Sequence, residues 1–159
     1  MKIVNDSIFS YSATHTIVHC ISLDCVMGKG IAKQIVDLNP NLRKLLLNGP
    51  FDLDIGRSYY IEDIHKVINM ITKEFYYDKP TYLDFINALI DIRRIVEEND
   101  IKKIVMPKIG CGLDKLEWTK VKFLIEQILD DVVEELIVCD LSKWDWQNIA
   151  NYATIFKLE

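Results

Sequence analysis

Residues 16–36 read TIVHCISLDCVMGKGIAKQIV, and this stretch decides the fold class. The run from Thr16 to Ser22 is short, apolar and rich in β-branched residues, which is typical of a buried strand. Two glycines, Gly28 and Gly30, follow in a turn, and an apolar helical pattern begins at Ile31. Strand, glycine turn and helix in this order predict one unit of an α/β protein.

The same alternation continues along the chain. Further strands are expected over residues 57–61, 66–71, 103–106 and 136–139, and helices over residues 31–36, 42–47, 82–98 and 118–133. The clearest helical pattern is that of residues 82–98, in front of which Thr81 and Asp84 predict a capping box. Strands separated by helices need crossover connections, so we expect a largely parallel sheet with helices on both faces.

Composition limits the class of protein. The chain has 159 residues, of which 50% are hydrophobic, and this predicts one domain over residues 1–159. Residues 142–159, with Trp144, Trp146 and Tyr152, are expected to pack on that domain. The net charge of −5 argues against broad non-specific binding of nucleic acid.

Features that the sequence lacks predict where the protein resides and whether it binds a metal. No apolar run is long enough for a membrane span, and residues 1–6 do not have the pattern of a secretory signal, so a cytoplasmic protein without membrane contact is expected. The four cysteines are then expected to be reduced thiols. Their spacing does not provide the paired ligands of a zinc site, so neither a metal nor a cofactor is expected.

Two glycine loops follow predicted strands and precede predicted helices. The first spans residues 24–32 (DCVMGKGIA) and the second spans residues 107–114 (PKIGCGLD). Glycines at such turns let backbone amides approach an anion, and the helix start adds partial positive charge. Ligands of such sheets bind beyond the carboxyl ends of the strands, so two such loops predict a diphosphate site. The alternative is that the glycines only serve turns with positive φ. Neither loop has the spacing of a P-loop or of a dinucleotide-binding motif.

At this point the sequence resembles the macrodomain family, within it the branch of terminal ADP-ribose protein glycohydrolase and the DNA ADP-ribosyl glycohydrolase antitoxins. The resemblance covers about residues 16 to 141. Its motifs are HCIS at 19–22, CVMGKGIA at 25–32, ITK at 71–73, KPTY at 79–82 and MPKIGCGLD at 106–114, with Trp118 after them. The resemblance implies a three-layer α/β/α fold with a mixed, largely parallel central sheet and an ADP-ribose cleft across the strand ends.

The resemblance also implies roles for single residues. Lys73 is the expected nucleophile, whose neutral amine attacks the distal ribose, and Asp114 is expected to transfer protons. Gly28, Lys29 and Gly30 are expected to line the distal ribose. The diphosphate is expected to meet backbone amides of Gly110, Cys111, Gly112 and Leu113. Other ligand-binding residues expected in the cleft are Ser22, Met27, Ile31, Pro107 and Ile109.

The adenine end departs from the family pattern. The family usually places a Gly-Asp pair before an apolar residue and Phe near the first strand, with the Asp binding the adenine amine. Here the segment is Asn5-Asp6-Ser7-Ile8-Phe9, so Ser7 stands at the Asp position and Asp6 takes its place only if the loop shifts by one residue. Asp6, Ser7 and Ile8 are therefore the residues expected at the adenine.

The function expected from the resemblance is a hydrolase that binds ADP-ribose and removes it from a protein Glu or Asp ester or from a DNA base, with possible O-acetyl-ADP-ribose deacetylase activity. The expected partners are ADP-ribose and an ADP-ribosylated protein or DNA, and a monomer is expected. Two alternatives stay open: an ADP-ribose 1''-phosphate phosphatase that uses His19, and a reader that binds ADP-ribose without chemistry.

Single residues also have plainer interpretations. Lys73 at a strand end is by composition alone a solvated lysine, and Asp114 with Glu117 fits a helix N-cap. His19 and Cys20 lie in an apolar strand, where core roles are commoner than catalytic ones. Cys111 is expected to be structural.

Overall fold

A computed structural model describes residues 1–141, and the prediction for residues 142–159 lies outside them. The strands are β1 (Lys2–Val4), β2 (Thr16–Ser22), β3 (Arg57–Glu62), β4 (Lys66–Lys73), β5 (Lys103–Pro107) and β6 (Glu135–Cys139). The helices are the short 3-10 helix η1 (Ile8–Ser10), α1 (Gly30–Leu38), α2 (Leu42–Asn48), α3 (Tyr82–Glu98) and α4 (Trp118–Ile128).

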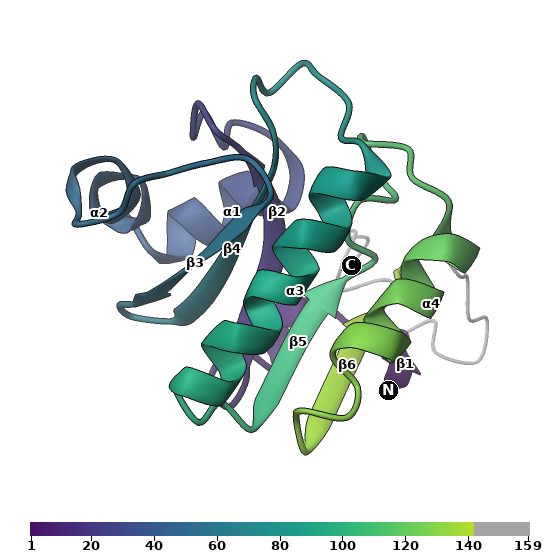
Figure 1. Ribbon diagram of the computed structural model, residues 1–159. Coiled ribbons are helices and arrows are strands. Elements are labelled where there is room, and N and C mark those ends of the chain that lie inside the picture. The colour runs from purple at the N-terminus through teal and green to yellow at the C-terminus, as the bar shows by residue number, and fades with distance from the viewer. Residues whose placement is uncertain (142–159) are drawn as a thin grey trace, which may run out of the picture.

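The strands form one mixed sheet in the order β1-β6-β5-β2-β4-β3. Only β3 runs antiparallel to its neighbour among the strands of residues 1–141. The strand β2 lies between β5 and β4, so the carboxyl ends of three parallel strands meet at one edge of the sheet (Figure 1). This confirms the predicted α/β class with a largely parallel sheet.

Alternating side chains of the strands pack into two separate cores. On one face of the sheet, Val18 and Met70 pack with α3 and α4 around the fully buried Phe85. On the other face, Ile17 and Ile71 pack with α1 and α2. Strand side chains alternate between faces, so buried strands between two helical layers are apolar throughout. The three layers α/β/α follow from this pattern.

The helix α3 has the bounds that its periodicity predicts. Thr81 is its N-cap residue, and the Thr81 hydroxyl oxygen accepts a hydrogen bond of 3.1 Å from the backbone amide of Asp84. The Thr81 hydroxyl in turn donates to the Asp84 carboxylate at 3.0 Å. A cap of this kind satisfies an amide that has no partner within the helix.

Three features differ from the prediction. The strand β1 and the helix η1 were not expected, since each has three residues and too little pattern to detect. The helix α4 ends at Ile128, whereas periodicity predicted residue 133. The apolar pattern continues because Leu129, Val132 and Val133 still pack on the core from a turn.

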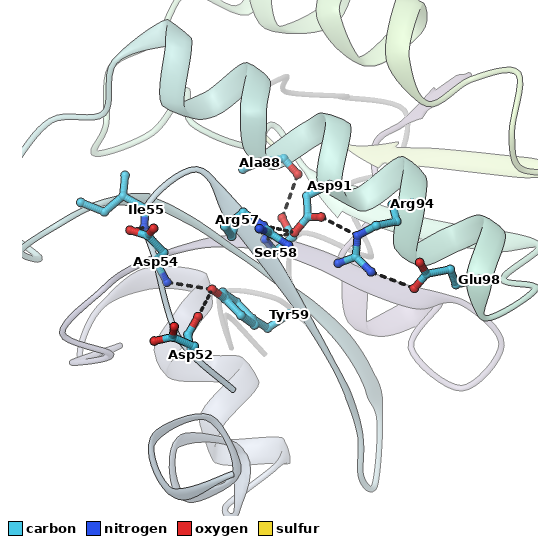
Figure 2. Close-up of polar contacts among 10 residues, drawn as sticks. All are labelled: Asp52, Asp54, Ile55, Arg57, Ser58, Tyr59, Ala88, Asp91, Arg94 and Glu98. Carbon is cyan, nitrogen blue, oxygen red and sulfur yellow. Dashed lines mark hydrogen bonds and ion pairs between the residues drawn. The ribbon is translucent and has the colours of Figure 1, made fainter. Parts of the chain in front are cut away.

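The edge strand β3 is tied to α3 by one buried carboxylate (Figure 2). Asp91 accepts hydrogen bonds from the amide of Ser58 at 2.8 Å, from Arg57 Nε at 3.1 Å and from Arg94 Nε at 2.8 Å. Burial acts to raise the pKa of Asp91, but the hydrogen bonds from Arg94, Ser58 and Arg57 outweigh it and lower that pKa. The ionised form of Asp91 is thereby favoured in the folded protein.

Candidate functional site

A cleft of about 600 Å³ opens at the carboxyl ends of β2, β4 and β5, where the last residues of these strands, Ser22, Lys73 and Pro107, line it. Its volume lies in the range of small-molecule sites. Both glycine loops border it. Of the predicted site residues, the structure brings together Ser22, Met27, Gly28, Lys29, Gly30, Ile31, Lys73, Pro107, Ile109, Gly110, Gly112, Leu113 and Asp114.

The first glycine loop has an unusual backbone. Cys25 and Met27 have φ values of +52° and +48°, and Gly30 has +60°. Positive φ is uncommon for residues other than glycine and often marks ligand sites. Arg43 of α2 holds the loop through a hydrogen bond of 2.7 Å from its Nε to the carbonyl oxygen of Cys25. The helix α1 then begins without a side-chain cap on its first amides, so its N-terminal end suits an anion.

The second glycine loop needs one of its glycines for the fold. Gly110 has a φ of +73°, and a Cβ there would lie 2.8 Å from Leu116 Cδ1 and 3.1 Å from Phe85 Cε2. Gly112 lies in the same loop and lines the cleft, but a Cβ there would meet nothing within 4 Å. Only Gly110 is therefore required by packing, whereas Gly112 keeps the surface of the cleft open.

Lys73 and Asp114 meet inside the cleft. Lys73 Nζ donates a hydrogen bond of 2.6 Å to Asp114 Oδ1, and both side chains are only 12% exposed. A β-bulge helps to place the lysine, because Ile21 pairs with Ile71 while the next residue, Ser22, pairs with Lys73, so that Thr72 is the extra residue. Bulges near active sites commonly re-aim a side chain.

The structure decides against the plainer interpretations of Lys73 and Asp114. The interpretation of Lys73 as a solvated lysine is wrong. The interpretation of Asp114 as a helix N-cap is also wrong, because Glu117 is the N-cap residue of α4.

One residue that the sequence interpretation did not include, Tyr76, also reaches the cleft. Tyr76 lines it, and its backbone amide donates to Asp24 Oδ2 at 3.0 Å. Burial acts to raise the pKa of Asp24, but hydrogen bonds from Ser22, Tyr76 and Val26 lower it. At the end of the same loop, Lys79 Nζ donates a hydrogen bond of 2.5 Å to the carbonyl oxygen of Leu113, in the second glycine loop. The loop 74–79 is thus held to both glycine loops.

Four predicted ligand-binding residues do not line the cleft. Asp6 is exposed and accepts a hydrogen bond of 3.4 Å from the Tyr11 hydroxyl. Ser7 caps η1, since its hydroxyl oxygen accepts from the amide of Phe9, and Ile8 is a core residue with 2% exposure. The amide of Cys111 already donates to the carbonyl oxygen of Lys108 at 3.1 Å. These residues have structural contacts of their own.

His19 and Cys20 line the cleft from β2, yet their chemistry is that of buried groups. His19 is 2% exposed, and its Nε2 lies 2.6 Å from Asn69 Oδ1. Burial lowers the pKa of His19 to about 4, against the smaller opposing effect of the hydrogen bond with Asn69. Burial also raises the pKa of the Cys20 thiol well above its usual range. A neutral imidazole and a protonated thiol fit the core roles expected of them.

The described part of the chain contains no group of three or more His, Cys, Asp or Glu side chains placed to hold a metal ion. No helix within residues 1–141 is both long and apolar enough to span a membrane.

Comparison with known proteins gives several similarities. The ADP-ribose glycohydrolase OARD1 of Bos taurus is 32% identical over 127 residues, which make up 80% of this chain and 82% of that protein. The DNA ADP-ribosyl glycohydrolase of Mycobacterium tuberculosis is 31% identical over 119 residues, or 69% of this chain and 33% of that protein. The macrodomain of Thermus aquaticus DarG superposes with a TM-score of 0.75 at 23% identity, covering 87% of this chain and 96% of that one. No family model matches the chain.

Proposed function

Because the chain belongs to the macrodomain family of ADP-ribose glycohydrolases, we propose that its cleft binds ADP-ribose and that it is a hydrolase releasing ADP-ribose from a modified macromolecule. The observation that carries this proposal is the contact of 2.6 Å between Lys73 and Asp114 within the cleft. The name of one relative, a DNA ADP-ribosyl glycohydrolase, points to DNA as an acceptor, and a protein side chain is the second acceptor that we propose. Hydrolysis of O-acetyl-ADP-ribose is a further activity that the same cleft would support.

We infer one orientation for ADP-ribose in the cleft. The amides at the start of α1 and those around Gly112 supply partial positive charge for the diphosphate, as helix starts and glycine turns do for anions. The distal ribose then lies beside Gly28 and Gly30, next to Lys73. In this orientation the bond to be broken would lie next to Lys73 and Asp114.

The chemistry follows from the two side chains. An amine is a nucleophile only when neutral, so Lys73 must give up a proton, and Asp114 Oδ1 is the acceptor that it contacts. The amine then attacks the anomeric carbon of the distal ribose, and the bond to the acceptor breaks. Asp114 returns the proton to the leaving group, and water later releases the ribose from the lysine. Both side chains are largely shielded from water, which strengthens these interactions.

The two alternatives receive less support from the geometry. A phosphatase that uses His19 would need an imidazole that reaches substrate, whereas the Nε2 of His19 is engaged by Asn69. A reader module would need neither Lys73 nor Asp114, and an ion pair that is 12% exposed is costly to keep without a use.

The test is turnover of an ADP-ribosylated protein and an ADP-ribosylated oligonucleotide by the Lys73→Ala variant, followed as free ADP-ribose. We expect turnover to fall at least about a hundredfold, the scale for removing a catalytic group, while calorimetry shows a modest change in ADP-ribose affinity. Lys73→Arg should not restore turnover, because a guanidinium stays protonated. When the ribose ring bound to Lys73 opens, the C1–O bond of the ring breaks and a Schiff base with the lysine forms, which borohydride should reduce and so trap on Lys73. Full activity of Lys73→Ala would refute the covalent mechanism, and a protein inactive on every substrate would be a reader.

A further inference from the structure

Three consecutive aromatic residues stand on the surface shortly after Lys73, from which Glu74 separates them. Phe75, Tyr76 and Tyr77 are 40%, 55% and 66% exposed. The rings of Phe75 and Tyr77 stack with centroids 5.4 Å apart and planes 10° apart, and Tyr76 meets Tyr77 edge-on at 5.3 Å. Single exposed apolar residues are ordinary, but a cluster of stacked rings is not. We call these three residues the aromatic rim.

The aromatic rim is held in place beside the reacting bond. Tyr76 lines the cleft three positions after Lys73, and its amide is bound by Asp24. Within the loop, the amide of Phe75 donates to Asp78 Oδ2 at 3.0 Å. With Lys79 bound to the carbonyl of Leu113, the loop is fastened at two of the three aromatic residues and again after them. A fastened surface loses little conformational entropy when it binds a partner.

The position of the rim determines what it meets. In the proposed reaction the acceptor is bonded to the ribose carbon that Lys73 attacks, so the acceptor leaves the cleft next to Lys73. Tyr76 lines the same cleft as Lys73 and follows it by three residues. We propose that the aromatic rim is a stacking platform for the base of a single-stranded nucleic acid that carries the ADP-ribose, an inference that rests on the proposed function.

A base suits this surface better than a modified protein side chain. Every nucleobase has a π-face that stacks on aromatic rings, and stacking of this kind accepts single strands, whose bases are free. An esterified Glu or Asp offers only a short aliphatic chain. The exposed carboxylate of Glu74 adjoins the rim, so phosphate groups gain little there. The base, and not the phosphodiester backbone, is therefore the part that the rim contacts.

The experiment compares two substrates. One is a single-stranded oligodeoxynucleotide that carries ADP-ribose on one base, and the other is a peptide with ADP-ribose esterified to Glu. For Tyr76→Ala we expect kcat/KM on the oligonucleotide to fall by about five- to a hundredfold, the measured range for loss of one stacked base, and kcat/KM on the peptide to fall by a smaller factor, because Tyr76 also lines the cleft that both substrates enter. The loss should be the same at low and high salt, because stacking releases no counterions.

Two variants serve as controls. Tyr76→Phe keeps the ring and should keep most of the activity on the oligonucleotide. Phe123→Ala removes an aromatic side chain of α4 that is 59% exposed and does not line the cleft, and it should change neither activity. If Phe123→Ala lowered the activity on the oligonucleotide as much as Tyr76→Ala, loss of any exposed ring would explain the effect and the platform would be refuted.

Other outcomes overturn the proposal in distinguishable ways. An equal loss on both substrates would place Tyr76 against the ADP-ribose itself, and a loss on the peptide alone would assign the rim to protein acceptors. No loss on either substrate also refutes the platform.

Binding separates the platform from the catalytic mechanism. In the Lys73→Ala background, the modified oligonucleotide should bind more tightly than free ADP-ribose, and Tyr76→Ala should remove that difference. If ADP-ribose itself does not bind, the proposed function fails and the platform fails with it. If ADP-ribose binds but the oligonucleotide gains nothing, only the platform fails.

Discussion

The two glycines of the second loop should respond to substitution in opposite ways. In Gly110→Ala the alanine must take a φ of +73°, and its Cβ would lie 2.8 Å from Leu116 Cδ1 and 3.1 Å from the ring of Phe85. A left-handed conformation costs a residue other than glycine about 1 to 2 kcal/mol. Crowding adds about 1 to 2 kcal/mol, the lower part of the range for overpacking, because the end of Leu116 can move while the buried Phe85 cannot.

The sum for Gly110→Ala is about 2 to 4 kcal/mol of unfolding free energy. For a domain of this size that corresponds to a melting temperature lower by roughly 5 to 15 °C. In Gly112→Val no strain or clash arises within the protein, so the unfolding free energy should change by less than about 1 kcal/mol. Its side chain instead enters the cleft where the diphosphate amides are proposed, and ADP-ribose affinity should fall at least about tenfold, or about 1.4 kcal/mol.

Urea unfolding and calorimetry with ADP-ribose measure the two effects separately. AMP provides a matched ligand, since it lacks the second phosphate and the distal ribose and should bind more weakly than ADP-ribose to the unmodified protein. A stable Gly110→Ala protein would refute the packing argument. Unchanged ADP-ribose affinity in a folded Gly112→Val protein, or equal affinity for AMP and ADP-ribose, would mean that the loops are ordinary turns.

Further predictions concern pH and loop attachment. Because the pKa of His19 falls from 6.5 to about 4 on folding, the unfolded chain binds the extra proton, so stability should decline by about 3 kcal/mol as pH falls from 6.5 to 4; urea titrations of His19→Gln should give a flatter profile, and an identical profile would contradict this. Asp91→Asn should lower the unfolding free energy by about 1 to 3 kcal/mol at neutral pH. Since the pKa of Asp91 in the folded protein lies below 3.8, the stabilisation that Asp91 gives is present above pH 3.8 and is lost at lower pH. The unfolding free energies of the unmodified protein and of Asp91→Asn should therefore become equal in acid. A difference in unfolding free energy that stayed constant with pH would show that ionisation of Asp91 is not its cause. Asp24→Ala should speed hydrogen exchange at the amide of Tyr76 by about ten- to a hundredfold, and no change there would show that other contacts hold the loop.

The sequence alone was sufficient to predict those elements whose own residues show a regular hydrophobic spacing and a capping motif. The helix α3 shows apolar residues at helical spacing and a capping pair at Thr81, so its bounds were predictable without knowledge of the rest of the fold. The strand β1 was not predictable, because three residues become a strand only through pairing with β6, over a hundred residues away in sequence. The end of α4 was misjudged because Val132 and Val133 remain half-buried after the helix has stopped.

In the candidate site, too, some residues were predictable from sequence motifs and others depend on how the chain folds. The glycine loops and the expectation of Lys73 and Asp114 came from motifs, and the structure brings these two side chains into contact. The positions of Asp6 and Ser7 away from the cleft depend on how η1 packs, which no motif encodes. Tyr76 was visible as part of an aromatic run after the lysine, but its place at the cleft depends on the hydrogen bond to Asp24.

The bulge at Thr72 makes the site sensitive to insertions and deletions as well as to substitutions. Thr72 is the extra residue of this bulge, so its removal would let Lys73 follow Ile71 in a regular strand, still paired with Ser22 but without the bend that re-aims its side chain. A chain lacking only Thr72 would retain every residue of the candidate site, but its lysine would lose the bulge that aims the amine at Asp114. Sequence comparisons that score residue identity and ignore single-residue gaps at this strand end would rate such a chain as intact.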